Sequence, residues 1–406
     1  MRPEETSYCQ RVLEEIRGRR SETDGVHSMN SPTIVIPDAD AELSLKVMRC
    51  LGIHRGFKTY LVTSEVANPA IRSRFCAGTE MRQGISDAAH LDRLLQLGRG
   101  RQGGILLPVT LSGFQFVATN REALTSAFRL PPLPPRETIG LASDKWRLFK
   151  LAREHDLPLL PSEAVTTQVI DAIRSGTSDL RLPVLVKSRQ RRGGAGFQKL
   201  VSPEQLDSFG SRITDSDRDE YLVQPFIQGR DYSLSVFCEK GVIKAYTLWR
   251  ALAYGGRQYT IPRVIQFVEH DGILSAGRKL MAILEWEGVC DIDFFMDEEA
   301  EHFWLLEVNA RFWQTVSAAA AAGVNFPVLC CEAATATRAF HWPSQKDGLC
   351  YSRPSGVPAL LTMRDTRLRG SLDILRNTGL GEILRDPLPE IATLLNRAAR
   401  RRVLPD

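Results

Sequence analysis

One stretch of the sequence constrains the fold more than any other: VCDIDFFMDEEAEHFWLLEVNAR, residues 289 to 311. Two runs in which apolar and polar residues alternate flank an acidic turn, which is the pattern of an antiparallel β-hairpin. If Asp293 lies opposite Glu307, the same register places Asp291 opposite Asn309, and all four side chains point to one face. The stretch therefore predicts a row of polar groups on an otherwise apolar sheet.

This polar row needs a positive partner. At about 4 Å, two carboxylates repel each other by roughly 4 kcal/mol when the effective dielectric constant is near 20. Magnesium fits, because this hard cation takes oxygen ligands from one or two carboxylates and fills its other positions with water and nucleotide phosphates. A solvated outer face of the sheet is the alternative. The large apolar residues around the row, and Arg311 that continues it, favour a binding site.

A basic, glycine-rich segment upstream is a candidate anion site. In RLPVLVKSRQRRGGAGFQKLV, residues 181 to 201, a strand ends at Lys187 and a return strand follows the turn. Glycines let backbone amides wrap phosphate oxygens, while the lysine adds a point charge. A simple surface hairpin is the alternative interpretation. The glycines concerned are Gly193, Gly194 and Gly196.

A second basic position lies at a predicted helix start. In LASDKWRLFKLAREHDLPLLPS, Ser143 or Asp144 can cap a helix that opens with Lys145. A cation at a helix amino terminus opposes the helix dipole, so an anionic ligand at this place would explain it. An exposed lysine without a ligand is the alternative.

The chain length and the order of elements predict several domains. At 406 residues the chain exceeds one ordinary core. From residue 33, strands alternate with helices, which favours a doubly wound parallel sheet. A proline-rich linker, LPPLPPRET, marks a boundary near 138. We expect an extension at 1–30, an α/β domain at 31–138, a second unit at 139–342 and a basic helical region at 343–406.

Composition excludes several classes of protein. The 52 basic and 48 acidic residues are spread evenly, so a nucleic-acid partner is not expected. The eight cysteines lack metal-ligand spacing, which favours reduced thiols in a cytoplasmic protein. The amino terminus has no apolar core of a signal peptide, and no stretch predicts a membrane span.

The order of these features resembles the ATP-grasp superfamily. Lys145, Lys187 with its glycine loop, a strand hinge at 224–231 and then the acidic hairpin follow the family's order. The ending EVNARFW is similar to that of the carbamoyl-phosphate-synthetase-like branch. The resemblance implies an amino-terminal doubly wound parallel-sheet (pre-ATP-grasp, Rossmann-like) domain, followed by a two-lobed α+β ATP-grasp unit whose lid spans about 160–222.

The resemblance also implies a role for each matching residue. ATP phosphates would meet Lys145 and Lys187 under a lid loop made of Gly193, Gly194 and Gly196. The adenine would meet Gln224, Phe226 and Ile227, and the ribose Asp231. Magnesium, or manganese in its place, would be held by Asp293, Glu307 and Asn309. The transferred phosphate or the substrate carboxylate would meet Arg311 and Arg250.

Two positions depart from the family pattern. Gln224 stands where the family often has an acid, which changes the side-chain contact with adenine. Asp291 stands where the D-alanine-ligase-like branch has an arginine that stabilises developing charge. The missing cation could come from Arg311 or Arg250.

The activity implied by the resemblance is the ATP-dependent joining of a carboxylate to an amine through an acyl phosphate, with release of ADP and phosphate. Amino acids, short peptides and small biosynthetic acids are the expected substrates, and a homodimer is compatible with the family. Three alternatives stay open. They are a phosphotransferase on the same fold, a nucleotide-binding module without catalysis, and a sugar- or cofactor-binding protein that uses the amino-terminal sheet.

Overall fold

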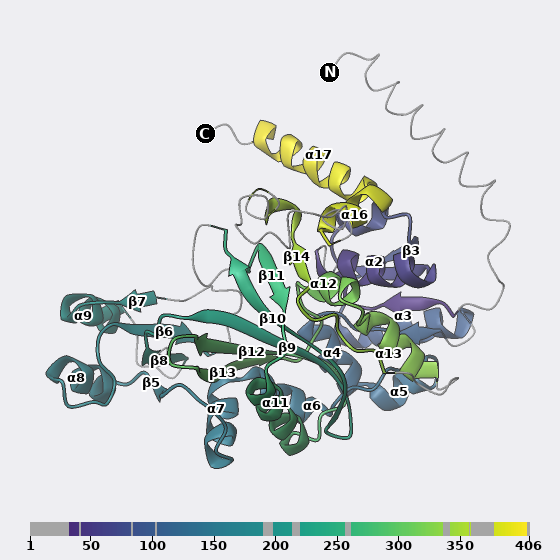
Figure 1. Cartoon of the computed structure of the whole chain (residues 1–406). Coiled ribbons are helices and arrows are strands. Elements are labelled where there is room, and N and C mark those ends of the chain that lie inside the picture. Colours follow the sequence, from purple (N-terminus) through teal and green to yellow (C-terminus); the bar gives the residue numbers. More distant parts are fainter. Residues whose placement is uncertain are drawn as a thin grey trace. The chain divides into compact units, whose positions relative to one another are not determined.

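The computed structural model describes residues 32–39, 42–82, 84–101, 104–189, 198–212, 220–255, 261–335, 342–356, 358 and 377–403. The expected extension at 1–30 and the loop glycines Gly193, Gly194 and Gly196 lie outside these residues. Thr33–Asp406 forms one compact unit, and Met1–Pro32 is a separate one. The described part of the larger unit contains three sheets (Figure 1).

The first sheet is parallel, as the alternation of strands and helices predicts. Its strands lie in the order β3-β2-β1-β4, and every pairing between neighbours is parallel. The strands are β1 (Ile34–Ile36), β2 (Thr59–Thr63), β3 (Cys76–Met81) and β4 (Ile105–Leu106). The helical segments are α2 (Leu43–Arg55), η2 (Pro69–Arg72), α3 (Asp87–Gly100), α4 (Leu111–Thr119) and α5 (Arg121–Thr125).

A carboxylate of the protein itself, that of Asp38, lies at the carboxyl end of this sheet. The Asp38 carboxylate, just after β1, accepts hydrogen bonds from Val109 N at 3.0 Å and Thr110 N at 2.6 Å, both just after β4. Burial raises the pKa of Asp38 to about 6, although these bonds oppose the rise. At this strand end, where doubly wound sheets often bind ligands, an internal carboxylate ties the two strands together.

The central sheet is antiparallel and carries the predicted hairpin at one edge. Its order is β13-β12-β9-β10-β11-β14. The strands are β9 (Arg230–Glu239), β10 (Val242–Ala253), β11 (Val264–Phe267), β12 (Gly288–Asp297), β13 (His302–Asn309) and β14 (Cys350–Ser352). The accompanying helices are α6 (Arg136–Ser143), α7 (Lys145–Glu154), α11 (Asp271–Ile283), α12 (Val316–Ala321) and α13 (Phe326–Thr335).

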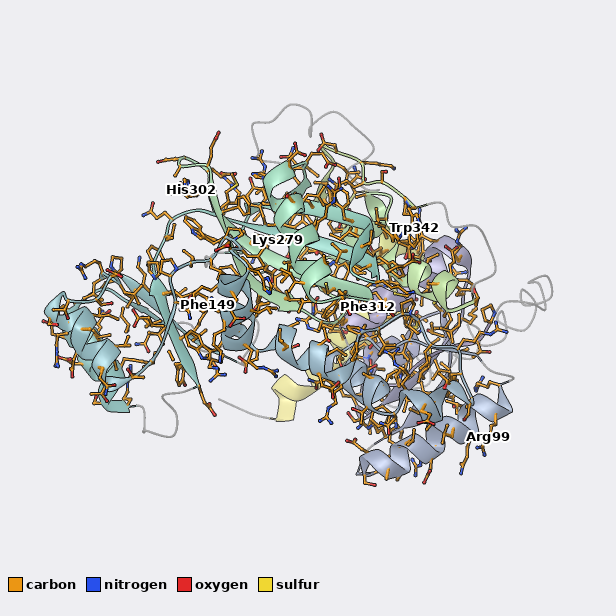
Figure 2. All side chains as sticks on the ribbon, turned by 90° about the horizontal axis from the view of Figure 1, so that it is seen from below. Arg99, Phe149, Lys279, His302, Phe312 and Trp342 are labelled. Atoms are coloured by element: carbon orange, nitrogen blue, oxygen red, sulfur yellow. The ribbon has the colours of Figure 1, made fainter. Side chains whose placement is uncertain are left out.

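One hydrophobic core joins the parallel sheet to the central sheet. Phe312, just past β13, is fully buried and lies edge-on to Phe114 of α4, with ring centroids 6.2 Å apart. Figure 2 shows Phe312 among the side chains that fill the interior. The residues that follow the polar row are therefore anchored in the core and not in a loose loop.

A third, smaller sheet has a core of its own. It has the order β5-β8-β6-β7 and is antiparallel, with α8 (Thr167–Ser175) and α9 (Pro203–Arg212) beside it. Its strands are β5 (Glu163–Ala164), β6 (Val184–Ser188), β7 (Gln198–Leu200) and β8 (Tyr221–Pro225). Val184, Val186 and Phe209 belong to an apolar cluster separate from the main core, so this lobe packs around residues of its own. The fold class predicted from the sequence is confirmed.

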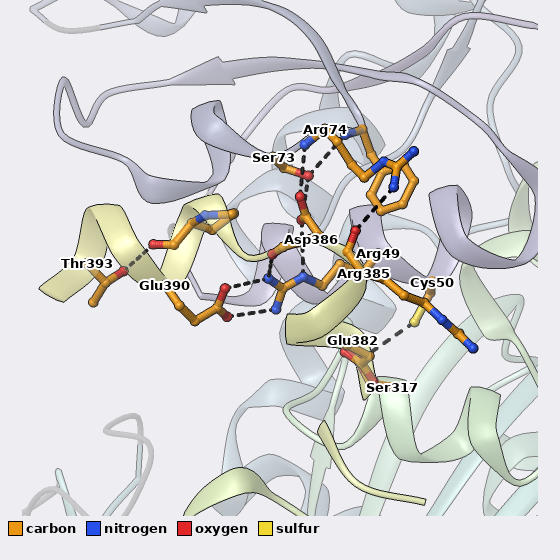
Figure 3. Close-up of polar contacts among 12 residues, drawn as sticks. Arg49, Cys50, Ser73, Arg74, Ser317, Glu382, Arg385, Asp386, Glu390 and Thr393 are labelled. Atoms are coloured by element: carbon orange, nitrogen blue, oxygen red, sulfur yellow. Dashed lines mark hydrogen bonds and ion pairs between the residues drawn. The ribbon is translucent and has the colours of Figure 1, made fainter. Parts of the chain in front are cut away.

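Two helices near the carboxyl end of the chain are tied to α2 and to the segment after η2 by a buried ion network (Figure 3). These are α16 (Gly379–Arg385) and α17 (Leu388–Val403), which follow the short η3 (Pro354–Gly356). Arg49 of α2 meets Asp386 Oδ2 at 3.2 Å and Glu390 Oε2 at 2.6 Å. Asp386 also accepts from Ser73 Oγ at 2.7 Å. The carboxyl-terminal helices are therefore part of the packed unit.

Two further predictions concern thiols and membranes. Of the seven described cysteines, all but Cys76 are buried. None of the helices in the described residues combines the length and the apolar character needed to cross a bilayer.

We predict that Arg49→Met destabilises the protein strongly. Arg49 and Asp386 are 5% and 1% exposed, so the substitution leaves a buried carboxylate without its cation, at a cost of about 3 to 5 kcal/mol. Arg55→Met on the same helix is the control, because its pair with Glu332 is exposed and contributes about 0 to 1 kcal/mol. Urea unfolding measures both free energies. Equal effects of the two substitutions would contradict the assignment.

Candidate active site

The hairpin has the register that the sequence predicts. Asp293 pairs with Glu307, and Asp291 pairs with Asn309. These four residues line one cavity of about 260 Å³. A bulge after Asp293 shifts the register, and it leaves Leu306 outside the ladder but on the cavity wall beside Glu307. Strict alternation would turn Leu306 to the other face, so the bulge adds an apolar wall to the polar row.

Two basic residues and an amide bridge the row. Lys145 Nζ lies 2.7 Å from Glu307 Oε2. Asn309 donates through Nδ2 to Asp293 Oδ2 at 2.9 Å, and Arg311 donates through Nη2 to Asn309 Oδ1 at 3.1 Å. The row thus contains two linked sets of side chains, the Lys145–Glu307 ion pair and the chain from Arg311 through Asn309 to Asp293.

The start of α7 fixes the position of Lys145. Asp144 caps the helix and accepts hydrogen bonds from Trp146 N at 2.9 Å and Arg147 N at 3.1 Å. Arg189, at the end of β6, meets the same carboxylate at 3.0 Å. Of the two caps that the sequence allows, the structure uses Asp144.

Crowded carboxylates give the row an unusual electrostatic state. Burial, followed by the charges of Asp291 and Glu307, raises the pKa of Asp293 well above its usual range. Burial alone would also raise the pKa of Glu307, but the nearby cations Lys145, Lys187 and Arg311 together outweigh it and lower that pKa. A cation between Asp293 and Glu307 would relieve this crowding.

The donor set fits magnesium better than a metal that prefers nitrogen or sulfur. The described residues contain no group of three or more His, Cys, Asp or Glu arranged to hold a metal. The available donors are instead two carboxylates and the amide oxygen of Asn309. All are hard oxygen ligands, and magnesium needs only one or two carboxylates when phosphates complete its shell.

Two serines that sequence reasoning missed support Asp291. Ser233 and Ser235 of β9 each donate to Asp291 Oδ1 at 2.6 Å. Burial raises the pKa of Asp291, and these two bonds oppose the rise. The signal was present in YSLSVF, where the serines alternate with apolar residues. The serines reach Asp291 only because β9 pairs with β12, and the sequence did not predict that pairing.

The second predicted lysine enters the cavity from the small lobe. Lys187 lies at the end of β6, is 5% exposed and lines the same cavity as Glu307. Burial lowers the pKa of Lys187 to about 8, with Lys145 adding to the effect and Glu307 opposing it. Burial makes the charged form of Lys187 less stable, and an anionic ligand beside the ammonium group would stabilise that charged form again.

The residues predicted to meet a nucleotide base lie together at one part of the cavity. Gln224, Phe226 and Ile227 line it with the apolar side chains Leu160, Leu185 and Leu306. The Gln224 amide donates to Ser162 Oγ, and Phe226 N donates to Pro183 O at 3.0 Å. The Phe226 N–H is therefore engaged inside the protein and not with a ligand.

Asp231 and Arg250 have different surroundings. Asp231 lines the cavity, and the Tyr254 hydroxyl donates to its Oδ2 at 2.5 Å. Arg250 is not among the residues that line the cavity. Its guanidinium contacts Gln266 Oε1 at 3.0 Å and Glu298 Oε1 at 3.3 Å. Its catalytic role stays a prediction that this placement does not support.

Several further residues line the cavity that were not predicted one by one from the sequence. They carry apolar, amide or hydroxyl side chains, and only folding brings them to the site: Trp249, Ile261, Pro262, Trp313, Gln314 and Thr315. Arg311 lines the cavity beside them, as predicted.

Comparisons with known proteins agree with this geometry. Residues 217–353 match a family model described as "ATP-grasp in the biosynthetic pathway with Ter operon". Urea amidolyase of Saccharomyces cerevisiae is 24% identical over 221 residues, which is 50% of this chain and 12% of that protein. D-alanine–D-alanine ligase B of Pseudomonas putida is 26% identical over 205 residues, 47% of this chain and 63% of the ligase. The chain thus spans only part of these relatives.

A solved structure extends the similarity to most of the fold. The biotin carboxylase domain of Hydrogenobacter thermophilus 2-oxoglutarate carboxylase, described with MgADP, ADP and bicarbonate, has a TM-score of 0.59. The match covers 80% of this chain and 73% of that domain at 16% identity, so it speaks for the fold alone. The matching family model, the related ligase and the shared fold therefore all make this chain similar to ATP-grasp proteins.

Proposed function

We propose that this protein is an ATP-dependent ligase that joins a carboxylate to an amine. The observation that carries the proposal is the meeting of Lys145 and Lys187 with the carboxylates of Asp293 and Glu307 in one cavity. Cations suited to phosphates and oxygen ligands suited to magnesium are both needed to bind ATP productively.

ATP would lie along the cavity. The adenine would be placed among Leu160, Leu185 and Leu306, with Gln224 and the Phe226–Ile227 backbone at its edge, and the ribose would be near Asp231. Lys145 and Lys187 would then hold the phosphates. Magnesium, held by Asp293, Glu307 and Asn309, would neutralise phosphate charge when it is bound.

The chemistry follows from a thermodynamic problem. A carboxylate and an amine do not condense favourably in water, so the carboxylate oxygen would first attack the γ-phosphorus and release ADP. The amine nitrogen would then attack the acyl carbon, the bond to the phosphate oxygen would break, and the amine would lose a proton. No protein nucleophile is required. The lysines and Arg311 contribute by positioning the reacting groups and by offsetting negative charge.

The small lobe provides a means of excluding water. Lys187 and Gln224 come from this lobe, whereas Asp293 and Glu307 come from the central sheet. Because the lobe has its own core, it could close over the ligand as a unit, with Gly193, Gly194 and Gly196 completing the cover as the sequence predicts. Closure would protect an acyl phosphate from hydrolysis.

The related D-alanine–D-alanine ligase supports the reaction class, but it does not define the substrates. We propose small-molecule acids and amines as substrates, a cytoplasmic location, no nucleic-acid or membrane partner, and a homodimer as a compatible assembly.

The proposal is tested by product analysis with Mg²⁺, ATP and mixtures of acids and amines. The expected products are ADP, phosphate and an amide in equal amounts. A phosphorylated product that retains the phosphate would establish a phosphotransferase instead. Tight ATP binding without turnover of any mixture would favour a binding module.

We predict that Glu307→Gln lowers the rate of ADP release by roughly a hundredfold or more, because it removes one of the two metal-binding charges. Thermal unfolding checks that the variant is folded. Glu299→Gln, the same change in the exposed turn of the hairpin, is the control and should retain the wild-type rate. Wild-type turnover by Glu307→Gln would refute the metal assignment.

We predict that ATP affinity falls as pH rises above about 8. In the free protein Lys187 loses its proton near that pH, and bound phosphate favours the charged form, so binding must take up a proton at higher pH. Linkage then lowers affinity by up to about tenfold per pH unit. Titration calorimetry measures the dependence. Lys187→Arg, which stays charged, should flatten it; an unchanged slope in that variant would exclude Lys187 as the group responsible.

A further inference from the structure

The cavity extends past the phosphate-binding residues to a second end. Trp313, Gln314 and Thr315 continue the wall beyond Arg311, and Trp249, Ile261 and Pro262 complete it. The proposed nucleotide contacts do not use these side chains, so this end is available for the carboxylate substrate.

A lysine from the amino-terminal domain fixes the side chain of Gln314. Lys46 of α2 donates through Nζ to the side-chain oxygen of Gln314 and, at 2.9 Å, to its main-chain oxygen. Glu42 lies 3.3 Å from the same Nζ and holds it in place. An ammonium group only donates, so the Gln314 amide must turn its oxygen toward Lys46. Its NH₂ group is then a donor for which no described residue supplies an acceptor.

The charged groups at this end also favour an anion. Arg311 donates two hydrogen bonds, from Nη1 to Phe312 O at 2.6 Å and from Nη2 to Asn309 Oδ1 at 3.1 Å. A guanidinium has five N–H donors, so further donors remain. Asp291, one of the carboxylates that line the cavity, already receives two serine hydroxyls. Trp249, Ile261 and Pro262 add largely apolar surface, which suits an uncharged hydrocarbon group better than a second ammonium group.

We propose that Gln314 is a specificity-determining residue that donates a hydrogen bond to the carboxylate of an acid with an apolar body, and that Lys46 is its positioning residue. This assignment rests on the proposed function, because it names the acid class for the same cavity. It also gives the amino-terminal α/β domain a part in substrate recognition, through α2.

The test uses phenylacetate as the probe, with phenylacetamide and acetate as comparisons. Titration calorimetry is done on the full chain with Mg²⁺ and a non-hydrolysable ATP analogue. Phenylacetate should bind at least about tenfold more tightly than phenylacetamide, because a hydrogen bond to a charged group contributes more than one to a neutral group. Acetate should also bind at least about tenfold more weakly, because it buries no apolar body.

Variants separate recognition from folding. Gln314→Glu keeps an oxygen for Lys46 but replaces the NH₂ donor by an acceptor, so phenylacetate affinity should fall at least about tenfold. Affinities for phenylacetamide and for the ATP analogue should stay unchanged. Gln168→Glu, the same change on the exposed face of α8, should leave phenylacetate binding as in the wild type. Lys46→Met should weaken phenylacetate, and Lys46→Arg should recover part of the loss.

Three results would overturn the assignment: wild-type phenylacetate affinity in Gln314→Glu, equal affinity for phenylacetate and phenylacetamide, or no phenylacetate binding by protein that binds the ATP analogue. Failure to bind the ATP analogue would instead overturn the proposed function, and this assignment with it.

Discussion

The crowding of carboxylates on one buried face of a hairpin is the constraint on which the site depends. Asp291, Asp293 and Glu307 lie on adjacent strands, and burial denies them the water that would disperse their charge. The protein compensates with Lys145, with the Asn309 amide and with serine hydroxyls, but the raised pKa of Asp293 shows that the compensation is incomplete. A ligand that brings a divalent cation would complete it.

Each part of the fold contributes to this arrangement. The helix cap at Asp144 places Lys145 against Glu307, and the small lobe delivers Lys187 from the other side. The core that joins the two larger sheets anchors the residues after β13, where Arg311 and Gln314 lie. Arg49 and Lys46, three residues apart on α2, then connect this region to the carboxyl-terminal helices and to the cavity wall.

The sequence predicted those features that depend on local period and order. Alternation in residues 289 to 311 was enough to give the register of Asp293 with Glu307, because a shift by one residue would have moved every side chain of one strand to the opposite face. Strand and helix alternation gave the parallel sheet. The order of Lys145 and Lys187 along the chain predicted the two cationic positions in the cavity.

Features that depend on tertiary contacts could not be predicted. Leu306 enters the cavity only because of a bulge, and the Phe226 N–H is occupied by a distant carbonyl of Pro183. The place of Arg250 in the sequence predicted a contact with the substrate, but its guanidinium contacts Glu298 instead. Gln314 gained its orientation from Lys46, 268 positions earlier in the chain.

The most direct test of the account is the location of the metal. A crystal of the protein with Mn²⁺ and a non-hydrolysable ATP analogue would show the ion by its anomalous scattering. The account predicts a peak between the carboxylates of Asp293 and Glu307 and the phosphates, with Lys145 and Lys187 on the same phosphate chain. A nucleotide bound in this cavity with the ion away from both carboxylates would contradict it.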